Sequence, residues 1–195
     1  MKPLERAKIW DPVTRLWHWV LALTTALAWW FGEYMDFDTL QWHFYCGYLI
    51  LGLIAFRVLW GLIGPAPIRF SSLFRSIGQA PAYLRRVGNR EPSGVAGHNP
   101  LGSLAIIAML AALAVQAGAG LFIESEDFFE SAPFAHLVSQ ATSDTLIWIH
   151  RRLPNVIIAL VALHIGAMLF YLIWKRENLI SAMITGWKWV RRDSH

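Results

Sequence analysis

Two histidines on one apolar stretch are the first candidates for chemistry in this sequence. Residues 149–175 read IHRRLPNVIIALVALHIGAMLFYLIWK and contain His150 and His164, fourteen residues apart. An α-helix rises roughly 21 Å over fourteen residues and completes nearly a whole number of turns, so both imidazoles lie on almost the same face. The stretch can cross a bilayer, which needs about 20 apolar residues. Histidine inside a membrane span is costly, and by default it marks a functional site.

The composition indicates a membrane protein. Of the 195 residues, 56% are hydrophobic and only 15% are charged, whereas soluble domains have about 25% charged residues. The length suits one bundle rather than two domains. The single cysteine, Cys46, excludes an internal disulfide and a cysteine-rich metal site, and no C-x-x-C-H motif is present for covalent attachment of a haem. We interpret Cys46 as a small apolar packing residue.

Four apolar stretches predict membrane-spanning helices at about 16–34, 42–63, 101–123 and 149–174. Most lysines and arginines lie in the N-terminal segment, in loop 64–100 and in the tail, whereas loop 124–147 is acidic. The positive-inside rule then places both termini and loop 64–100 in the cytoplasm. Within that loop we expect a short surface helix over Ser71–Val87. The predicted fold class is therefore all-α, an integral membrane four-helix bundle that forms one domain over residues 1–195.

Depth along the spans sorts four histidines into two pairs. His18 lies just inside the cytoplasmic end of the first span, and His164 lies toward the cytoplasmic end of the fourth. His43 and His150 begin the second and fourth spans on the external side. Two imidazoles that face each other across a bundle core suit a porphyrin iron with axial ligands on both faces. We therefore expect His18 to face His164 and His43 to face His150, with haem iron between the members of each pair.

Arginines next to these histidines fit the propionate groups of a haem. Four of them share this placement: Arg15, Arg57, Arg151 and Arg152. Arg57 is fourteen residues after His43, so it reaches the depth of the inner pair. A buried arginine needs an anionic partner, and apart from Glu33 at the external end of the first span the spans contain no acid.

The histidines also admit other interpretations. A single histidine at a membrane interface is more often a polar anchor than a ligand, but four at matched depths argue against coincidence. A zinc or copper transport site usually adds carboxylates or thiols, which the spans offer only as Cys46. His98, His136 and His195 lie in loops or the tail, where we expect no ligand role. His136 lies in the acidic loop, where contact with a partner is a weaker alternative.

Short motifs along nearly the whole chain match a known family. They are Trp10-Asp11-Pro12, Arg15, His18-Trp19, His43, Gly47-Tyr48, Arg57, Trp60-Gly61, Gly64-Pro65, Gly97-His98-Asn99-Pro100-Leu101-Gly102, His150, His164, Arg176-Glu177-Asn178-Leu179, Ala182-Met183 and Thr185-Gly186. On these residues the chain resembles the bacterial cytochrome b561 and nickel–iron hydrogenase-type b cytochromes. The resemblance implies two non-covalent b haems, with His18–His164 and His43–His150 as the axial pairs. It also implies electron transfer between quinone and partner redox proteins.

These observations predict a di-haem b-type cytochrome of the bacterial inner membrane. We expect it to transfer electrons between the quinone pool and a partner, such as a periplasmic c-type cytochrome that docks on the external acidic loops. Two alternatives stay open: a haem-bearing anchor subunit of a hydrogenase or dehydrogenase, which the lack of a visible fifth span disfavours, and a quinol-linked oxidoreductase acting on a small molecule such as superoxide. Whether the chain is an enzyme, and whether it forms a homodimer, also stay open. The expected partners are the lipid bilayer, quinone and a redox subunit, and no nucleic acid.

Overall fold

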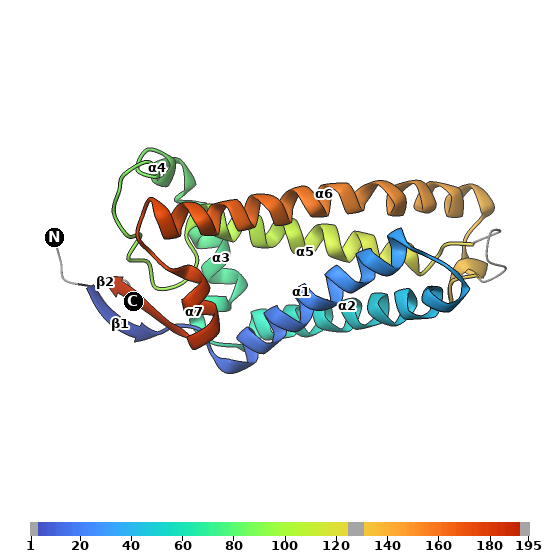
Figure 1. The fold of residues 1–195 in the computed structure, drawn as a ribbon, viewed down its shortest axis with the longest axis horizontal. Coiled ribbons are helices and arrows are strands. Elements are labelled where there is room, and N and C mark those ends of the chain that lie inside the picture. The colour runs from blue at the N-terminus through green and yellow to red at the C-terminus, as the bar shows by residue number, and fades with distance from the viewer. Residues whose placement is uncertain (1–3, 125–130, 192–195) are drawn as a thin grey trace. The chain divides into compact units, whose positions relative to one another are not determined.

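Four long helices dominate the computed structural model, which describes residues 4–124 and 131–191 (Figure 1). They are α1 (Pro12–Glu33), α2 (Phe37–Ile63), α5 (Pro100–Gly120) and α6 (Gln140–Ile173). The short helices are α3 (Phe70–Ile77), α4 (Ala80–Leu84) and α7 (Leu179–Thr185), with 3-10 turns η1 (Ala66–Ile68) and η2 (Ala135–Leu137). Two strands, β1 (Leu4–Lys8) and β2 (Trp187–Arg191), form one antiparallel pair. The prediction of an all-α membrane fold class is confirmed.

Three of the long helices, α2, α5 and α6, are long and apolar enough to cross a membrane. Each contains most or all of a predicted span. α6 begins at Gln140 rather than near 149, because polar residues extend the helix beyond its apolar part. α1 covers the first predicted span with 22 residues, a length of about 33 Å. Its tryptophans, threonines and His18 lower its hydropathy, so this first span stays a prediction.

Local sequence explains where three of the long helices begin. Asp11, Asp36 and Asn99 precede α1, α2 and α5, and each side-chain oxygen accepts a hydrogen bond from the backbone N–H three residues later, at 2.9, 2.7 and 2.8 Å. Such N-caps satisfy amide groups that have no partner inside the helix. Pro100 then occupies the first position of α5, where its missing N–H costs nothing.

The basic loop between α2 and α5 holds two short helices, so the prediction of one helix over Ser71–Val87 is wrong. α3 and α4 are separated by Gly78 and Gln79. Pro81, in the first turn of α4, has no N–H to continue the helical hydrogen bonding of α3. Leu73 of α3 is 1% exposed, which anchors that helix to the protein.

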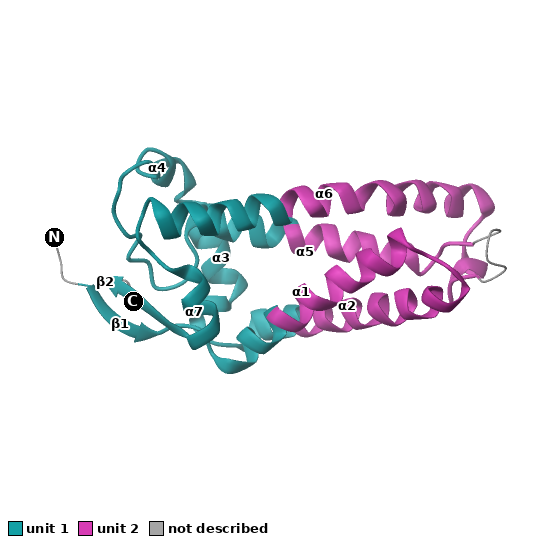
Figure 2. Cartoon of the chain, viewed as in Figure 1, with its two compact units in different colours: residues 1–18, 57–108, 161–195 teal, residues 19–56, 109–160 magenta. Residues whose placement is uncertain are grey.

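The chain forms two compact units (Figure 2). Unit 1 is built from residues 1–18, 57–108 and 161–195, and unit 2 from residues 19–56 and 109–160. Each long helix therefore contributes one part to each unit. His18 and His164 belong to unit 1, whereas His43 and His150 belong to unit 2. The single-domain organisation stays a prediction.

In unit 1 the tail folds back onto the segment that precedes α1. Gly186 ends α7 in a left-handed conformation with φ of +87°. Its carbonyl accepts hydrogen bonds from the backbone N–H groups of Ile9 and Trp10, at 2.9 and 3.2 Å. A Cβ at this position would lie 2.7 Å from the Trp10 carbonyl oxygen, so both the conformation and the close approach require glycine. This contact leads into the pairing of β1 with β2, which is not apparent from the sequence.

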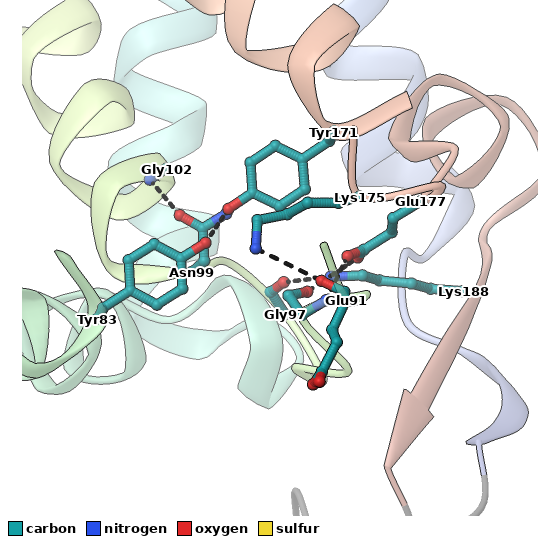
Figure 3. A network of polar contacts seen from close by, with 10 residues as sticks. Tyr83, Glu91, Gly97, Asn99, Gly102, Tyr171, Lys175, Glu177 and Lys188 are labelled. Carbon is teal, nitrogen blue, oxygen red and sulfur yellow. Dashed lines mark hydrogen bonds and ion pairs between the residues drawn. The ribbon is translucent and has the colours of Figure 1, made fainter. Parts of the chain in front are cut away.

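A buried ion pair within the tail of unit 1 is hydrogen-bonded to the loop before α5 (Figure 3). The Glu177 carboxylate lies 3.2 Å from the Lys188 ammonium, and both side chains are 5% exposed. Glu177 also accepts hydrogen bonds from the backbone N–H and the hydroxyl of Ser93, at 2.7 and 2.9 Å. Lys188 donates to the Gly97 carbonyl at 3.2 Å. Burial lowers the pKa of Lys188, and the adjacent Glu177 carboxylate opposes that effect.

Candidate functional site

His43 of α2 and His150 of α6 lie next to each other in unit 2. Their ring centroids are 5.9 Å apart and the ring planes are 80° apart. The Nδ1 atom of His43 lies 2.9 Å from the carbonyl oxygen of Ala28, and that of His150 lies 2.9 Å from the carbonyl oxygen of Gln116. A carbonyl only accepts hydrogen bonds, so each Nδ1 carries the proton and each Nε2 keeps its lone pair. Metal-ligating histidines are commonly oriented in this way.

The separation of this pair suits two ligands of one metal ion. With a metal–nitrogen distance of about 2 Å on each side, two imidazoles that share one metal have ring centres about 6 Å apart. A Cβ on Gly32 would lie 3.0 Å from the Cε1 atom of His43, and a Cβ on Gly120 would lie 3.1 Å from that of His150. Glycine at these two positions therefore leaves room for the imidazole rings. A Cβ on Gly47, one turn after His43 on the same face of α2, would meet nothing within 4 Å. The residues present therefore fit a bis-histidine haem.

His18 of α1 and His164 of α6 form the second pair, in unit 1. They are close enough to interact electrostatically. The two histidine pairs named from sequence depth are thus each brought together within one unit. Their role as ligands stays a prediction.

The guanidinium group of Arg57 is buried in unit 1, and only part of its N–H groups is hydrogen-bonded. It is 4% exposed, and one terminal nitrogen donates a hydrogen bond to the Ile68 carbonyl at 2.9 Å. The other terminal nitrogen is buried without a hydrogen-bond partner among the described residues. The rings of Trp17 and Phe70 lie 5.8 and 5.2 Å from the guanidinium carbon. Aromatic rings offset only part of the cost of burying a charge, so this arrangement suits an additional anionic group.

The other three arginines divide into two kinds. One terminal nitrogen of Arg15 donates to the Ile184 carbonyl, whereas its Nε is buried without a hydrogen-bond partner among the described residues. Arg151 and Arg152 are exposed on α6, and the Arg152 guanidinium lies 5.8 Å from the Trp148 ring. Arg15 and Arg57 therefore each have a buried N–H without a hydrogen-bond partner among the described residues. Arg151 and Arg152, which are exposed, have no such buried group. The predicted contact of each with a propionate stays untested.

Sequence reasoning missed His98, which belongs to the interior of unit 1. Its ring lies 4.5 Å from that of Trp10, and it hydrogen-bonds the backbone of Pro67. Burial, followed by the nearby charges of Lys188 and Arg57, lowers the pKa of His98 to about 3. The available signal was its place in Gly97-His98-Asn99-Pro100, directly before the start of α5. A loop position alone did not reveal the packing.

His98 makes the folded chain sensitive to acid. Because its pKa is about 3 when folded against 6.5 ordinarily, the unfolded state binds more protons between these values. Its contribution to stability is therefore full above pH 6.5 and is lost progressively as the pH falls toward 3. Between pH 7 and pH 5 we expect the loss to be about 2 kcal/mol. Thermal unfolding in detergent, followed by circular dichroism at both pH values, measures it.

The variant His98→Gln should show a smaller acid-induced loss of stability than the wild type. His136 provides the matched control because it is exposed in η2, so His136→Gln should behave as the wild type. If His98→Gln and the wild type lost the same stability in acid, His98 would not be the source of the acid sensitivity.

An apolar cleft of about 460 Å³ opens between α1 and α2 in unit 2. Leu27 and Phe31 line it from α1, and Cys46 and Leu49 line it from α2. Cys46 is buried, as expected for a packing residue. Volumes of this order accommodate small organic ligands. Trp42, the residue before His43 in α2, also lines the cleft, whereas neither His43 nor His150 does.

The remaining predicted features lie partly beyond the described residues. His195 and the acidic residues Glu126, Asp127 and Glu130 are outside them. Glu124 and Asp144 are both exposed, and Asp144 lies near the start of α6. Within residues 4–124 and 131–191, no group of three or more histidine, cysteine, aspartate or glutamate side chains is placed to hold a metal ion.

Comparisons with known proteins match nearly the whole chain. The sequence model of a family described as prokaryotic cytochrome b561 matches residues 9–186. The chain is 29% identical to a probable Ni/Fe-hydrogenase B-type cytochrome subunit of Rhizobium leguminosarum bv. viciae, over 95% of this chain and 90% of that protein. It is 26% identical to a protein of the same description from Azotobacter vinelandii, over 95% and 89% of the two chains. No solved structure gives a significant match.

Proposed function

Because the chain belongs to the prokaryotic cytochrome b561 family, we propose that it is a di-haem electron carrier of the bacterial inner membrane. Haem b, which the family implies, supplies one-electron exchange when bound. The observation that carries the proposal is the His43–His150 pair, with adjacent rings and both Nδ1 atoms bonded to backbone carbonyls. Helices α1, α2, α5 and α6 all contribute to it. Two imidazoles would fill both axial positions, which favours electron transfer over oxygen binding.

The chain's own residues would hold one haem in each unit. In unit 2, His43 and His150 offer Nε2 atoms, while the carbonyls of Ala28 and Gln116 fix the ring orientations. In unit 1, His18 and His164 are the corresponding pair. The buried, unused N–H groups of Arg57 and Arg15 support a role in binding propionate, because charge-assisted hydrogen bonds would complete them. Arg151 and Arg152 adjoin His150 and are the weaker candidates for such contacts.

Quinone is the proposed membrane-soluble redox partner. The cleft between α1 and α2 offers apolar surface for a hydrophobic ring or tail, and its lining includes Cys46, three residues after His43. Apolar lining with few polar groups is typical of such ligand sites. We propose that this cleft is the quinone site.

Filling the cleft should weaken quinol binding without removing haem. Leu49 lines the cleft and is 47% exposed, so Leu49→Trp should occupy part of its volume. We expect the half-saturating quinol concentration to rise about tenfold, which corresponds to about 1.4 kcal/mol. Stopped-flow absorbance during reduction by a short-chain quinol measures this, with the pyridine haemochrome assay reporting the haem content.

Leu23→Trp is the matched control for Leu49→Trp. Leu23 lies on α1 in unit 2, is 62% exposed and does not line the cleft. Its variant should retain wild-type quinol kinetics. Equal quinol kinetics for Leu49→Trp and Leu23→Trp would contradict the proposal that the cleft binds quinone.

A second candidate function concerns the partner. Two relatives are described as probable hydrogenase cytochrome subunits, which supports a membrane subunit that exchanges electrons with a hydrogenase. A periplasmic c-type cytochrome docking on the acidic loop 124–147 is the alternative partner, and turnover of superoxide at a quinol-linked site is the alternative activity. The distribution of charge supports an inner-membrane topology with both termini cytoplasmic.

Proteoliposomes test the function directly. Purified protein with quinol in the bilayer should become reduced. Reoxidation by an added c-type cytochrome, or hydrogen-dependent reduction after addition of a hydrogenase, would identify the partner class. Turnover of superoxide without any protein partner would favour the small-molecule alternative. Failure of quinol to reduce the protein at all would contradict the proposed function.

A further inference from the structure

One face of the β1–β2 sheet in unit 1 gathers tryptophans and cations. Each residue of β1 has a direct partner on β2, and directly opposed residues of an antiparallel pair project from the same face. One face therefore carries Leu4, Arg6, Lys8, Trp187, Trp189 and Arg191, and all six are exposed. On the opposite face, Lys188 and Val190 are 6% and 1% exposed and Ala7 is half-buried, whereas Glu5 is exposed. The first set, here called the Trp–Arg face, is thus the outer face of the sheet.

The Trp–Arg face is positively charged and partly apolar. It contains three cations and no acid among its six residues. The Arg6 guanidinium lies 5.1 Å from the Trp187 ring, which orders the two side chains together. Arg191 contacts Glu91 at 3.5 Å, and both side chains are nearly half exposed, so this pair is weak. Trp187 and Trp189 are 42% and 57% exposed. An occupant of this face must therefore be both anionic and able to accept aromatic rings.

Short connections keep this sheet near the ends of two membrane helices. Lys8 is four residues before the start of α1, and four residues extend to at most about 14 Å. β2 follows α6 through α7, whose Ile180 and Ile184 are exposed one turn apart. α7 therefore presents exposed apolar side chains in the segment directly before β2. Tryptophan combined with arginine and lysine is the composition typical of side chains at the membrane–water interface.

We propose that the Trp–Arg face binds the anionic phospholipid headgroups of the cytoplasmic leaflet. Arg6 and Lys8 contact the phosphates, while Trp187 and Trp189 lie among the headgroups. An acidic protein would satisfy the cations, but it would leave the exposed apolar side chains of Leu4, Trp187 and Trp189 unexplained. The inference rests on the proposed topology, with the sheet on the cytoplasmic side, and not on the haem ligands.

A spin label on the Trp–Arg face tests this proposal. Cys46 is the only cysteine, so Cys46→Ala with Leu4→Cys places a single nitroxide on the face and retains both tryptophans and all three cations. The full chain is placed in nanodiscs of phosphatidylcholine, either alone or with about 30% phosphatidylglycerol, the anionic lipid that the cations should attract. Power-saturation EPR then measures the collision rate of the label with a water-soluble nickel complex. With the anionic lipid, we expect this rate to fall about threefold.

Two controls separate binding by this face from general charge effects. A label at Leu137→Cys in η2 of the acidic loop, where the residue is 64% exposed, should keep its collision rate in both lipid mixtures. Arg6→Gln with Lys8→Gln should abolish the protection at position 4, whereas Arg85→Gln with Arg86→Gln, the same charge change on exposed residues outside the sheet, should preserve it.

The proposal is overturned if the label at position 4 is equally accessible in both lipids, as an acidic protein partner would predict. It is also overturned if both double variants reduce the protection equally. Because the readout requires no haem, its failure is distinguishable from a failure of the proposed electron-transfer function.

Discussion

Replacing His43 with alanine is expected to remove one b haem per chain and to leave the other in place. The imidazole of His150 would then be the single histidine ligand in unit 2, since the two rings lie 5.9 Å apart there. His18 and His164 belong to unit 1 and are untouched. The haem content should fall from two to one per chain, which halves the pyridine haemochrome absorbance. Low-spin EPR signals should lose one of their two components.

The set of histidine variants assigns each haem to its pair. His150→Ala should lose the same EPR component as His43→Ala, and His18→Ala and His164→Ala should both lose the other component. His136→Ala should keep both, because that residue is exposed in η2. If His43→Ala and His164→Ala lost the same component, the pairing within units would be refuted.

Removing the carboxylate of Glu177 should produce the largest loss of stability among single substitutions outside the haem ligands. Glu177→Ala leaves Lys188, whose side chain is 5% exposed, as an uncompensated buried charge, and it removes the acceptor of both Ser93 hydrogen bonds. Breaking a buried pair from one side typically costs about 3–5 kcal/mol. Differential scanning fluorimetry in detergent, supported by chemical unfolding, measures the change.

The exposed pair Arg191–Glu91 provides the matched control for this substitution. Both of its side chains are nearly half exposed, so Glu91→Ala should cost less than about 1 kcal/mol. The double variant Glu177→Leu with Lys188→Met should recover much of the stability, because it buries no charge. Similar losses in Glu177→Ala and Glu91→Ala would mean that the buried network contributes little (Figure 3).

The helices were predictable because their signals are local. Apolar runs of sufficient length predicted α2, α5 and α6, and the resemblance predicted the family that residues 9–186 match. Boundaries were less accurate where polar residues extend a helix, as at Gln140 in α6. The break between α3 and α4 was overlooked although Gly78 and Pro81 mark it in the sequence.

The features that the sequence did not reveal depend on distant contacts. β1 pairs with β2 although the strands lie at opposite ends of the chain, and no local pattern specifies such a partner. His98 was interpreted as a loop residue, because only packing against Trp10 and Pro67 shows its burial. Arg57 was named from its spacing, but the unused N–H that makes it a candidate for an anionic partner is visible only in three dimensions.

The haem content of the purified wild-type chain tests the central claim most directly. The measurement is the ratio of haem b, from the pyridine haemochrome spectrum, to protein, from quantitative amino-acid analysis. The account predicts two haems per chain, one for each histidine pair. One haem per chain would mean that one pair is structural and that the di-haem assignment is wrong, and a chain purified intact without any haem would contradict the proposed function as a whole.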